Sequence, residues 1–218
     1  MGKPSLLAKL LLALAVLTPA SARAQTPDDK PVMDIEGFRV DFSRIERSTI
    51  PEILPGYVIQ IRQIEAANLP APMLKLMREI PIIVDPKKPQ KGSHALFTSK
   101  YNSGRGGVFA DLRSLPEDRP ILLHEMIHAW DWNRYSFANP TIVRAYAQAK
   151  SSGVFPDQTS HFMENQREYF AISSTIYLTG RSDQPPFNCR KLANSQPEYI
   201  GFLQRLYGEH GFCRQTVP

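Results

Sequence analysis

The sequence predicts an α+β fold in which a small mixed β-sheet precedes a helical half. The first observation is that short apolar or alternating segments, separated by proline and glycine turns, fill the chain up to residue 112. The second is that apolar residues after residue 114 recur at helical spacings. Gly180 and Gly208 stand where two of these later segments end, as glycines at helix C-termini do.

The first half is expected to contain five strands and one short helix. The strands are residues 38–46, 57–66, 80–85, 94–99 and 107–112. In the second of them, Tyr57, Ile59 and Ile61 would share one face, as in a half-buried strand. The glycine-rich stretch between the last two strands predicts a hairpin. The short helix covers residues 72–78 and begins at a proline.

The second half is expected to contain four helices, over residues 120–132, 140–150, 161–178 and 195–207. The first of these has two possible starts. Ser114 and Glu117 fit a capping box, with serine at the cap and glutamate three residues later. Pro120 suits the first turn of a helix, so the helix can instead begin there. The apolar run that follows belongs to the helix in either case.

Residues 1–24 have the features of a cleaved secretory signal peptide. A positively charged start is followed by a short apolar run at residues 10–17 and then by small residues. The apolar run is too short to span a bilayer, which disfavours a stable membrane anchor. We therefore expect cleavage after Ala24, a single mature domain over residues 25–218, and a secreted or periplasmic location.

The mature chain has nearly balanced charge. The whole chain holds 26 basic and 21 acidic residues, for a net charge of +5. Removal of Lys3, Lys9 and Arg23 with the signal peptide leaves 23 basic residues against 21 acidic ones. This balance gives little reason to expect nucleic-acid binding. We expect a monomer whose partner is a peptide or protein substrate.

Cys189 and Cys213 are the only cysteines, and they are expected to form a disulfide. An exported chain with an even and minimal cysteine count favours one bridge. The bond would close a loop of about 25 residues and stabilise the fold by about 3 kcal/mol in the chain-entropy model. It would hold the two ends of the last predicted helix.

The segment HEMIH, residues 124–128, carries the chemistry. Residues four apart lie on one face of a helix, so His124 and His128 can direct two imidazoles at one metal ion. Glu125 is rotated by about 100° from His124, which places it beside the metal rather than on it. A base must lie there to take a proton from zinc-bound water, whose pKa falls to about 7. The pattern His-Glu-x-x-His on a helix is the zinc metalloprotease motif.

A catalytic zinc ion normally has three protein ligands and one open position. No further histidine follows His128 at the spacing of the metzincins, so the third ligand must come from farther along the chain. Glu164 and Glu168 are four residues apart, and spacing alone does not choose between them. Glu168 is favoured because it begins an apolar run that would pack against the first helix. Glu164 is nearer the helix start, where a glutamate often only opposes the dipole.

The sequence HEMIHAWD, followed about 40 residues later by EYFA, resembles the gluzincin family of zinc metallopeptidases. The group within it that includes the catalytic domain of anthrax lethal factor and its secreted bacterial relatives has the most similar motifs. The resemblance implies a zincin-like fold, with His124, His128 and Glu168 as Zn²⁺ ligands and Glu125 as the base. It also implies a helical half that carries both the HExxH helix and the helix of the third ligand. The expected activity is that of an exported zinc metallopeptidase.

Two positions depart from the family pattern. The family often has a tyrosine seven residues before the ligand glutamate, where this chain has His161. Seven residues are about two helical turns, so the imidazole can face the zinc ion and stabilise developing negative charge. It can equally be a surface histidine at a helix start. The acidic residue that relatives carry after the second motif is replaced by Ile172.

Two further expectations concern the surroundings of the motif. Asp131 lies about one turn after His128 and can accept the free ring N–H of a ligand histidine, or be a solvated residue at the helix end. Residues 107–112 are expected to form an edge strand on which a substrate pairs, as the resemblance to zincins implies. The alternative function is a secreted module that binds zinc without catalysis and serves as a scaffold or a surface for partners.

Overall fold

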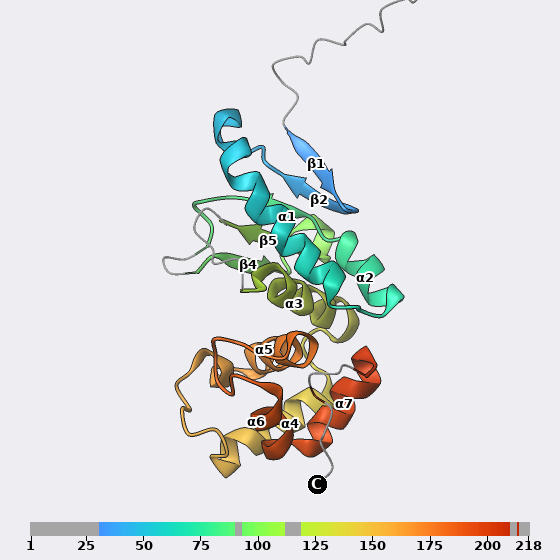
Figure 1. The fold of residues 1–218 in the computed structure, drawn as a ribbon, viewed down its shortest axis with the longest axis vertical. Coiled ribbons are helices and arrows are strands. Elements are labelled where there is room, and N and C mark those ends of the chain that lie inside the picture. The colour runs from blue at the N-terminus through green and yellow to red at the C-terminus, as the bar shows by residue number, and fades with distance from the viewer. Residues whose placement is uncertain (1–30, 90–92, 112–118, 210–212, 214–218) are drawn as a thin grey trace, which may run out of the picture.

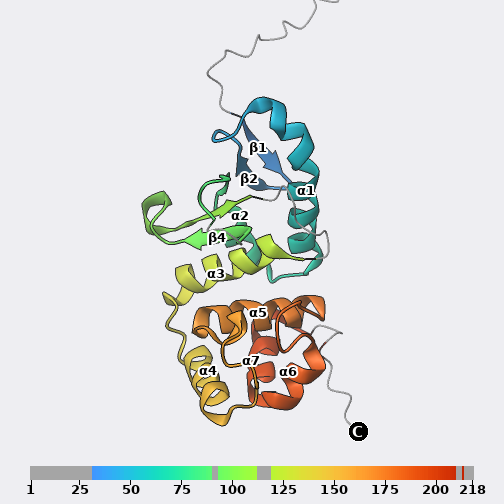
Figure 2. The same cartoon turned by 90° about the vertical axis from the view of Figure 1, so that its left-hand side faces the viewer.

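The computed structural model describes residues 31–89, 93–111, 119–209 and 213. In this part of the chain the molecule has two halves, stacked along its long axis (Figure 1). The first half is a five-stranded sheet with helices on one face, and the second half is entirely helical (Figure 2). The predicted α+β class is therefore confirmed. The predicted signal peptide and the capping box at Ser114 lie outside the described residues.

The sheet is mixed and has the strand order β1-β2-β3-β5-β4. Its strands are β1 Val32–Ile35, β2 Phe38–Asp41, β3 Ile82–Val84, β4 Ala95–Thr98 and β5 Gly107–Ala110. The pairs β1/β2 and β4/β5 are antiparallel, whereas β2/β3 and β3/β5 are parallel. Four of the five predicted strands are present, and β1 was not predicted.

The prediction that residues 107–112 form an edge strand is wrong. Residues 107–110 of this segment form β5, which lies between β3 and β4, and all four of them are buried. β4 is the edge strand on this side of the sheet, and its residues alternate between buried and partly exposed positions. The hairpin after β4 returns the chain to the inner position, so the later strand of the pair becomes the internal one. Glycine is required at Gly106 in this hairpin, because its φ is +94° and a Cβ atom would overlap the ring of Phe97.

The prediction of a strand at residues 57–66 is also wrong. These residues belong to helix α1, Ile50–Ala66. The buried positions of α1 are spaced by three and four residues, as on one face of a helix, and they are Ile50, Ile53, Tyr57, Gln60, Ile61 and Ile64. The alternation at Tyr57, Ile59 and Ile61 is a short coincidence within that longer pattern. The hydroxyl of Tyr57 donates to the backbone oxygen of Ala110 on β5 and joins α1 to the sheet.

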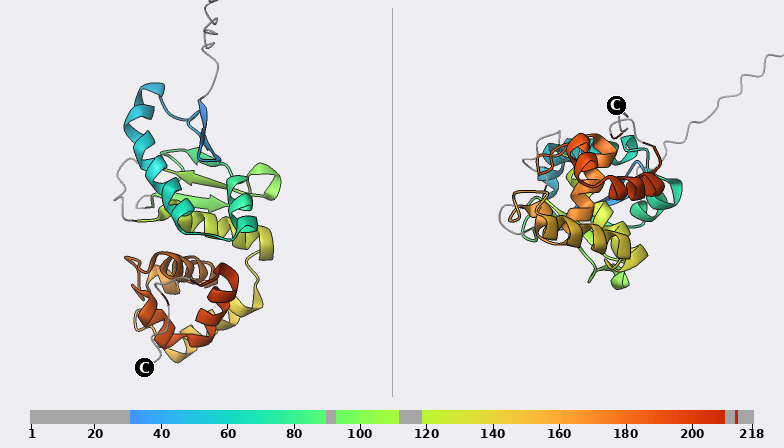
Figure 3. Two further views of the ribbon diagram at one scale, coloured as in Figure 1. Left: turned by 45° about the vertical axis from the view of Figure 1, so that its right-hand side comes forward. Right: turned by 90° about the horizontal axis from the view of Figure 1, so that it is seen from below.

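Helices α1, α2 (Ala71–Arg78) and α3 (Ile121–Tyr135) pack against one face of the sheet (Figure 3). The α2 prediction and the start of α3 after Pro120 are confirmed. Gln60 explains why α3 begins there without a capping side chain of its own. Its side chain accepts from the N–H of Leu122 and donates to the backbone oxygen of Arg119. One buried amide of α1 thus satisfies two backbone groups at the N-terminus of α3.

The helical half contains α4 Pro140–Ser152, α5 Gln166–Thr179, α6 Cys189–Ser195 and α7 Pro197–Tyr207. The predicted single helix over residues 161–178 is divided. A 3-10 turn at His161–Met163 precedes α5, and Asn165 caps α5 by accepting from the N–H groups of Arg167 and Glu168. The short helix α6 was not predicted. Helix α5 contacts α3 and so forms the boundary between the two halves.

The predicted disulfide between Cys189 and Cys213 is confirmed. The two Cα atoms are 5.1 Å apart, within the range that a disulfide spans, and both residues are buried. Both sulfur atoms lie against backbone oxygens of α5, at Ile176 and Tyr177. The bond therefore fastens the last part of the chain to the helix that carries Glu168.

Candidate metal site and groove

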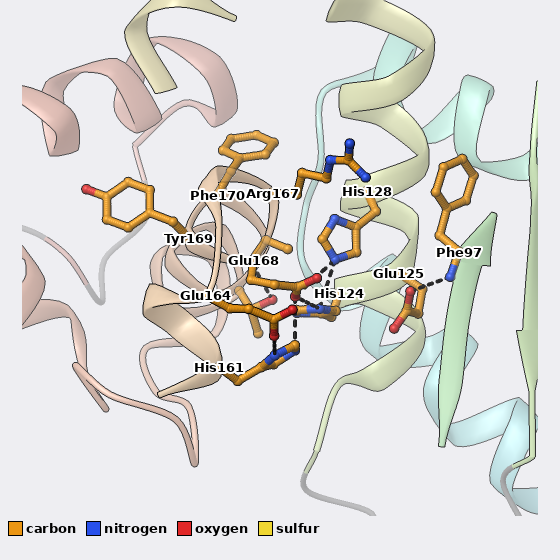
Figure 4. A network of polar contacts seen from close by, with 12 residues as sticks. Phe97, His124, Glu125, His128, His161, Glu164, Arg167, Glu168, Tyr169 and Phe170 are labelled. Atoms are coloured by element: carbon orange, nitrogen blue, oxygen red, sulfur yellow. Dashed lines mark hydrogen bonds and ion pairs between the residues drawn. The ribbon is translucent and has the colours of Figure 1, made fainter. Parts of the chain in front are cut away.

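Three side chains from two helices converge at the boundary between the halves. His124 and His128 lie on α3, and Glu168 lies on the first turn of α5 (Figure 4). The Nε2 atoms of the two imidazoles are 3.1 Å apart, and they lie 3.1 and 3.3 Å from Oε2 of Glu168. All three ligand atoms fall within 4.8 Å of one another. Of the two candidate glutamates, the structure brings Glu168 to the histidines.

The carboxylate of Glu164 contacts His161 rather than the two histidines of α3 (Figure 4). It lies before the N-cap of α5, so it does not share a helical face with Glu168 as an unbroken helix would require. Its side chain is 61% exposed, against 16% for that of Glu168, and its Oε2 lies 2.9 Å from Nδ1 of His161. Because the helix is interrupted at Asn165, the two glutamates lie on different elements, and Glu164 is largely exposed whereas Glu168 is largely buried.

The packing of α3 against α5 fixes this convergence. Both helices are largely buried: positions 169 to 178 of α5 are all buried, and so are most positions of α3. Trp130 of α3 and Phe170 of α5 have ring centroids 6.3 Å apart. The Glu168 backbone is also held, because its N–H donates to the Asn165 cap. The ligand atoms are thus carried by rigid elements rather than by loops.

The residues present fit a zinc ion. Two imidazole nitrogens and one carboxylate oxygen are a donor set that zinc favours, and three protein ligands leave a position open. Burial alone would raise the pKa of Glu168, but hydrogen bonds from His124, His128 and His161 outweigh it and hold that pKa well below its ordinary value. Glu168 is therefore an ionised carboxylate, as a metal ligand must be.

Glu125 lies beside the cluster and faces the sheet edge. Its carboxylate is buried, and Oε2 accepts from the N–H of Phe97 at 2.7 Å (Figure 4). The backbone N–H of Asp111 donates to the backbone oxygen of His94, so these two residues are a hydrogen-bonded pair of the antiparallel β4/β5 ladder. Because such pairs alternate along the ladder, Leu96 and Thr98 also form hydrogen bonds to β5, whereas Phe97 does not. The N–H of Phe97 consequently points away from β5, toward Glu125. Nothing in the sequence around Phe97 signals this contact, because it joins residues 28 apart.

His161 approaches the cluster from the α5 side, opposite Glu125 (Figure 4). Its Nε2 lies 3.0 Å from Oε2 of Glu168, and its side chain is 49% exposed. The hydrogen bond to Glu168 raises the pKa of His161 to about 9, against the effect of burial. An imidazolium is thus available next to the metal ligands at neutral pH.

Asp131 is neither the partner of a ligand histidine nor a solvated residue at the helix end, the two alternatives that the sequence left open. Within the described part of the chain it forms no hydrogen bond to either histidine of α3, and its buried Oδ1 atom has no hydrogen-bond partner. Only 2% of the residue is exposed, and burial raises its pKa to about 6 despite the opposing charge of His128. The two Nε2 atoms are directed at Glu168, while Asp131 is enclosed in the core.

A cavity of about 800 Å³ opens beside the cluster. His124, Glu125 and His161 line its near end, and residues 181–184 line its far end. Between them it follows α5, the start of α3 and the end of α1. These lining residues were not predicted, although the sequence holds a signal for those on α5. Ile172, Thr175 and Thr179 follow Glu168 at helical spacings of four, seven and eleven.

No helix in the described part of the chain is long and apolar enough to cross a bilayer. Comparison with protein-family models, with curated proteins and with solved structures found no match to this chain. The site itself is therefore the basis on which a function can be assigned.

Proposed function

We propose that this protein is an exported zinc-dependent peptidase that hydrolyses peptide bonds. The observation that carries the proposal is the convergence of His124, His128 and Glu168 within 4.8 Å, beside a buried carboxylate that accepts from the N–H of Phe97 on the edge strand β4. A nearby groove of about 800 Å³ supplies room for a substrate. The motifs that resemble gluzincins lie on the same residues.

His124, His128 and Glu168 would hold the ion. Zinc in such a site polarises a carbonyl oxygen and makes water acidic enough to lose a proton near neutral pH. Glu125 would accept a proton from the attacking water on the carboxylate oxygen that Phe97 does not occupy, and would pass it to the leaving amine. The bond from Phe97 N–H to Oε2 keeps the carboxylate in one orientation. The base is therefore positioned before substrate arrives.

The edge of β4 is the surface on which an extended substrate would pair. It replaces the predicted edge at residues 107–112, because β5 is internal. β4 lies directly against α3, so a strand added to it would pass the metal site. Backbone hydrogen bonds to an edge strand accept many sequences, which suits a peptidase. The buried Phe97 N–H that holds Glu125 belongs to this same edge.

His161 is the residue best placed to stabilise the negative charge that develops on the carbonyl oxygen. Its imidazolium lies at the open, half-exposed side of the cluster, 3.0 Å from Glu168. We expect His161→Gln to lower kcat by about 10²-fold, the cost typical of losing one oxyanion donor, with a much smaller change in KM. Steady-state kinetics, with metal analysis of the same preparations, makes the measurement.

The same contact favours one alternative function. Because Nε2 of His161 lies so close to Glu168, it could become a fourth protein ligand. Four protein ligands make a closed, structural zinc site, and the protein would then be a non-catalytic scaffold or partner-binding module. Under this alternative His161→Gln would lower zinc content, whereas the oxyanion role leaves zinc content unchanged.

The experiment that tests the peptidase proposal is digestion of a degenerate peptide library by zinc-loaded protein. Glu125→Gln protein and chelator-treated protein serve as the two blanks. New peptide termini that arise only with the active, zinc-loaded chain would support the proposal. A library that stays intact while the protein is folded and holds one zinc ion would contradict it and would favour the scaffold.

Export is the second part of the proposal, and the disulfide supports it. A disulfide persists outside a reducing cytosol, and residues 1–24 have signal-peptide features. We expect the exported protein to begin at Gln25 and to gain about two mass units on reduction, since each broken disulfide adds two hydrogens. Intact mass spectrometry measures both. A chain found in the cytosol with residues 1–24 still attached would contradict export.

A further inference from the structure

The connection between α3 and α4 contains two successive residues in the left-handed backbone conformation. Ser136 has a φ of +51° and ends α3, because its N–H donates to the backbone oxygen of Trp132. One left-handed residue is enough to end a helix, and glycine usually fills that position. Phe137 follows with a φ of +60°. A bulky residue seldom adopts this conformation, so the contacts of its side chain must offset the strain.

The ring of Phe137 packs among aromatic side chains and one cation. The rings of His128 and Phe97 meet it edge to face, with centroids 6.4 and 6.3 Å away. The ring of Trp132 lies 5.4 Å away, and the guanidinium carbon of Arg167 lies 4.4 Å from the centroid. Edge-to-face aromatic pairs and a cation above a ring are both favourable at such separations. These contacts hold Phe137 in its left-handed conformation.

The partners of this ring are themselves connected to the groups of the proposed metal site. His128 is a candidate ligand, and Arg167 directly precedes the ligand Glu168 at the start of α5. Phe97 holds Glu125 through its N–H. The ring thus contacts β4, α3 and α5, the elements on which the site is built.

The ring lies at the end of the site away from the groove. Among the described residues, the groove lining includes His124 and His161 but neither His128 nor Phe137. Figure 4 shows the same separation, with His161 at one end of the cluster and Arg167 at the other. A change of the ring can therefore alter the ligands without removing a wall of the groove.

We propose that Phe137 is a positioning residue of the metal site. Its ring fixes the imidazole of His128 relative to Phe97, the residue that holds the base. The ring also receives Arg167, so the first turn of α5 keeps its place beside α3. The inference rests on the proposed zinc site and peptidase function. A displacement of about 1 Å in such a site can cost about 100-fold in rate, so a contact that fixes the ligands has a large effect.

Substitutions at Phe137 separate the contributions of its ring. Phe137→Tyr keeps the aromatic ring. Phe137→Leu keeps an apolar side chain but removes the aromatic face, and Phe137→Gly removes both the side chain and the backbone strain. Phe187→Gly is the matched control. Phe187 also has a left-handed φ, of +70°, and its ring lies near Lys191 on α6, outside the metal site.

Zinc affinity is measured by competition with a chelator, at a temperature at which each metal-free variant is folded. We expect Phe137→Leu and Phe137→Gly to weaken zinc binding by about tenfold, the lower end of the range for residues that support metal ligands. Phe137→Tyr and Phe187→Gly should bind zinc as tightly as the parent. The visible absorption of Co²⁺-loaded protein depends on ligand geometry, and it should change in Phe137→Leu and Phe137→Gly but not in the other two variants.

Steady-state kinetics gives a readout that loss of stability alone would not produce. Phe137→Leu should lower kcat by about 10- to 100-fold, because the ligands and the base are displaced. KM should change by less than about twofold, because the ring does not line the groove. Phe137→Tyr should restore kcat.

The link to α5 is tested with Arg167→Gln. If the stacked pair acts as one unit, the effects of Phe137→Leu and Arg167→Gln on zinc affinity should not add. Arg144→Gln is the control, because Arg144 is exposed on α4, and its effect should be absent. Additive losses from the first two variants would remove Arg167 from the proposal.

The outcomes distinguish this inference from the peptidase proposal. Unchanged zinc affinity and an unchanged Co²⁺ spectrum in Phe137→Leu and Phe137→Gly would overturn the inference, and cleavage at the parent's rate would leave the peptidase proposal intact. Altered affinity and an altered spectrum in a protein that cleaves no peptide would support the inference and overturn the peptidase proposal. If Phe137→Gly does not fold, Phe137→Leu decides, because it retains an apolar side chain.

Discussion

Glu125→Gln should lower kcat by about 10³- to 10⁴-fold, as expected when a general base is removed. An amide has the shape of the carboxylate but cannot take a proton from water. Its carbonyl oxygen can still accept from the N–H of Phe97, so the side chain keeps its place and the fold is preserved. Zinc content should stay near one ion per chain, because Glu125 is outside the ligand cluster. Steady-state cleavage of a peptide found in the library measures the effect.

The matched control is Glu52→Gln, the same change on the exposed side of α1. It should retain full activity and the same melting temperature. Activity of the Glu125→Gln variant within about threefold of the parent would remove the base assignment, because general base catalysis is worth far more than that. Loss of zinc in Glu125→Gln would instead assign Glu125 to the metal site.

Glu168→Ala should weaken zinc binding by more than about 100-fold, since even outer partners of metal ligands contribute 10- to 100-fold. The substitution removes the carboxylate that His124 and His128 both contact. The two remaining imidazoles cannot complete a three-ligand site. Zinc per chain, measured by mass spectrometry after dialysis against a weak chelator, should fall to near zero.

Glu164→Ala is the control for that result. It removes an acidic side chain only four residues away, but one that is 61% exposed and directed at His161. Zinc content should stay at one ion per chain, and any effect should fall on kcat through His161. Zinc loss in Glu164→Ala with retention in Glu168→Ala would contradict the geometry of the cluster and move the third ligand to Glu164.

The sequence alone determined the parts of the site that depend on local spacing. A four-residue interval on a helix places His124 and His128 on one face, whatever surrounds the helix. The disulfide followed from having two cysteines in a chain with export features. The α+β class followed from strand-like segments that precede helical ones. Each of these properties needs only a few neighbouring residues or their count.

Short patterns failed where a longer one competed with them. The alternation at Tyr57, Ile59 and Ile61 predicted a strand, yet the same residues fall within seventeen residues of helical periodicity in α1. Gln60 is buried there because its amide meets the backbone of α3, 62 residues later in the chain. A polar residue on the inner face cannot be predicted without its distant partner. The same reason hid the role of Asn165, whose cap divides the predicted helix.

Only the tertiary structure decided which groups meet. The choice of Glu168 over Glu164 required the break at Asn165 and the packing of α5 on α3. The edge position of β4 required the hairpin to place β5 against β3. The contact of Phe97 with Glu125, and of Arg119 with Asp183, joins segments 28 and 64 residues apart. These distances are set by the hydrophobic burial of whole helix faces. Because that burial is summed over many residues, the distances cannot be predicted from the spacing of a few neighbouring residues.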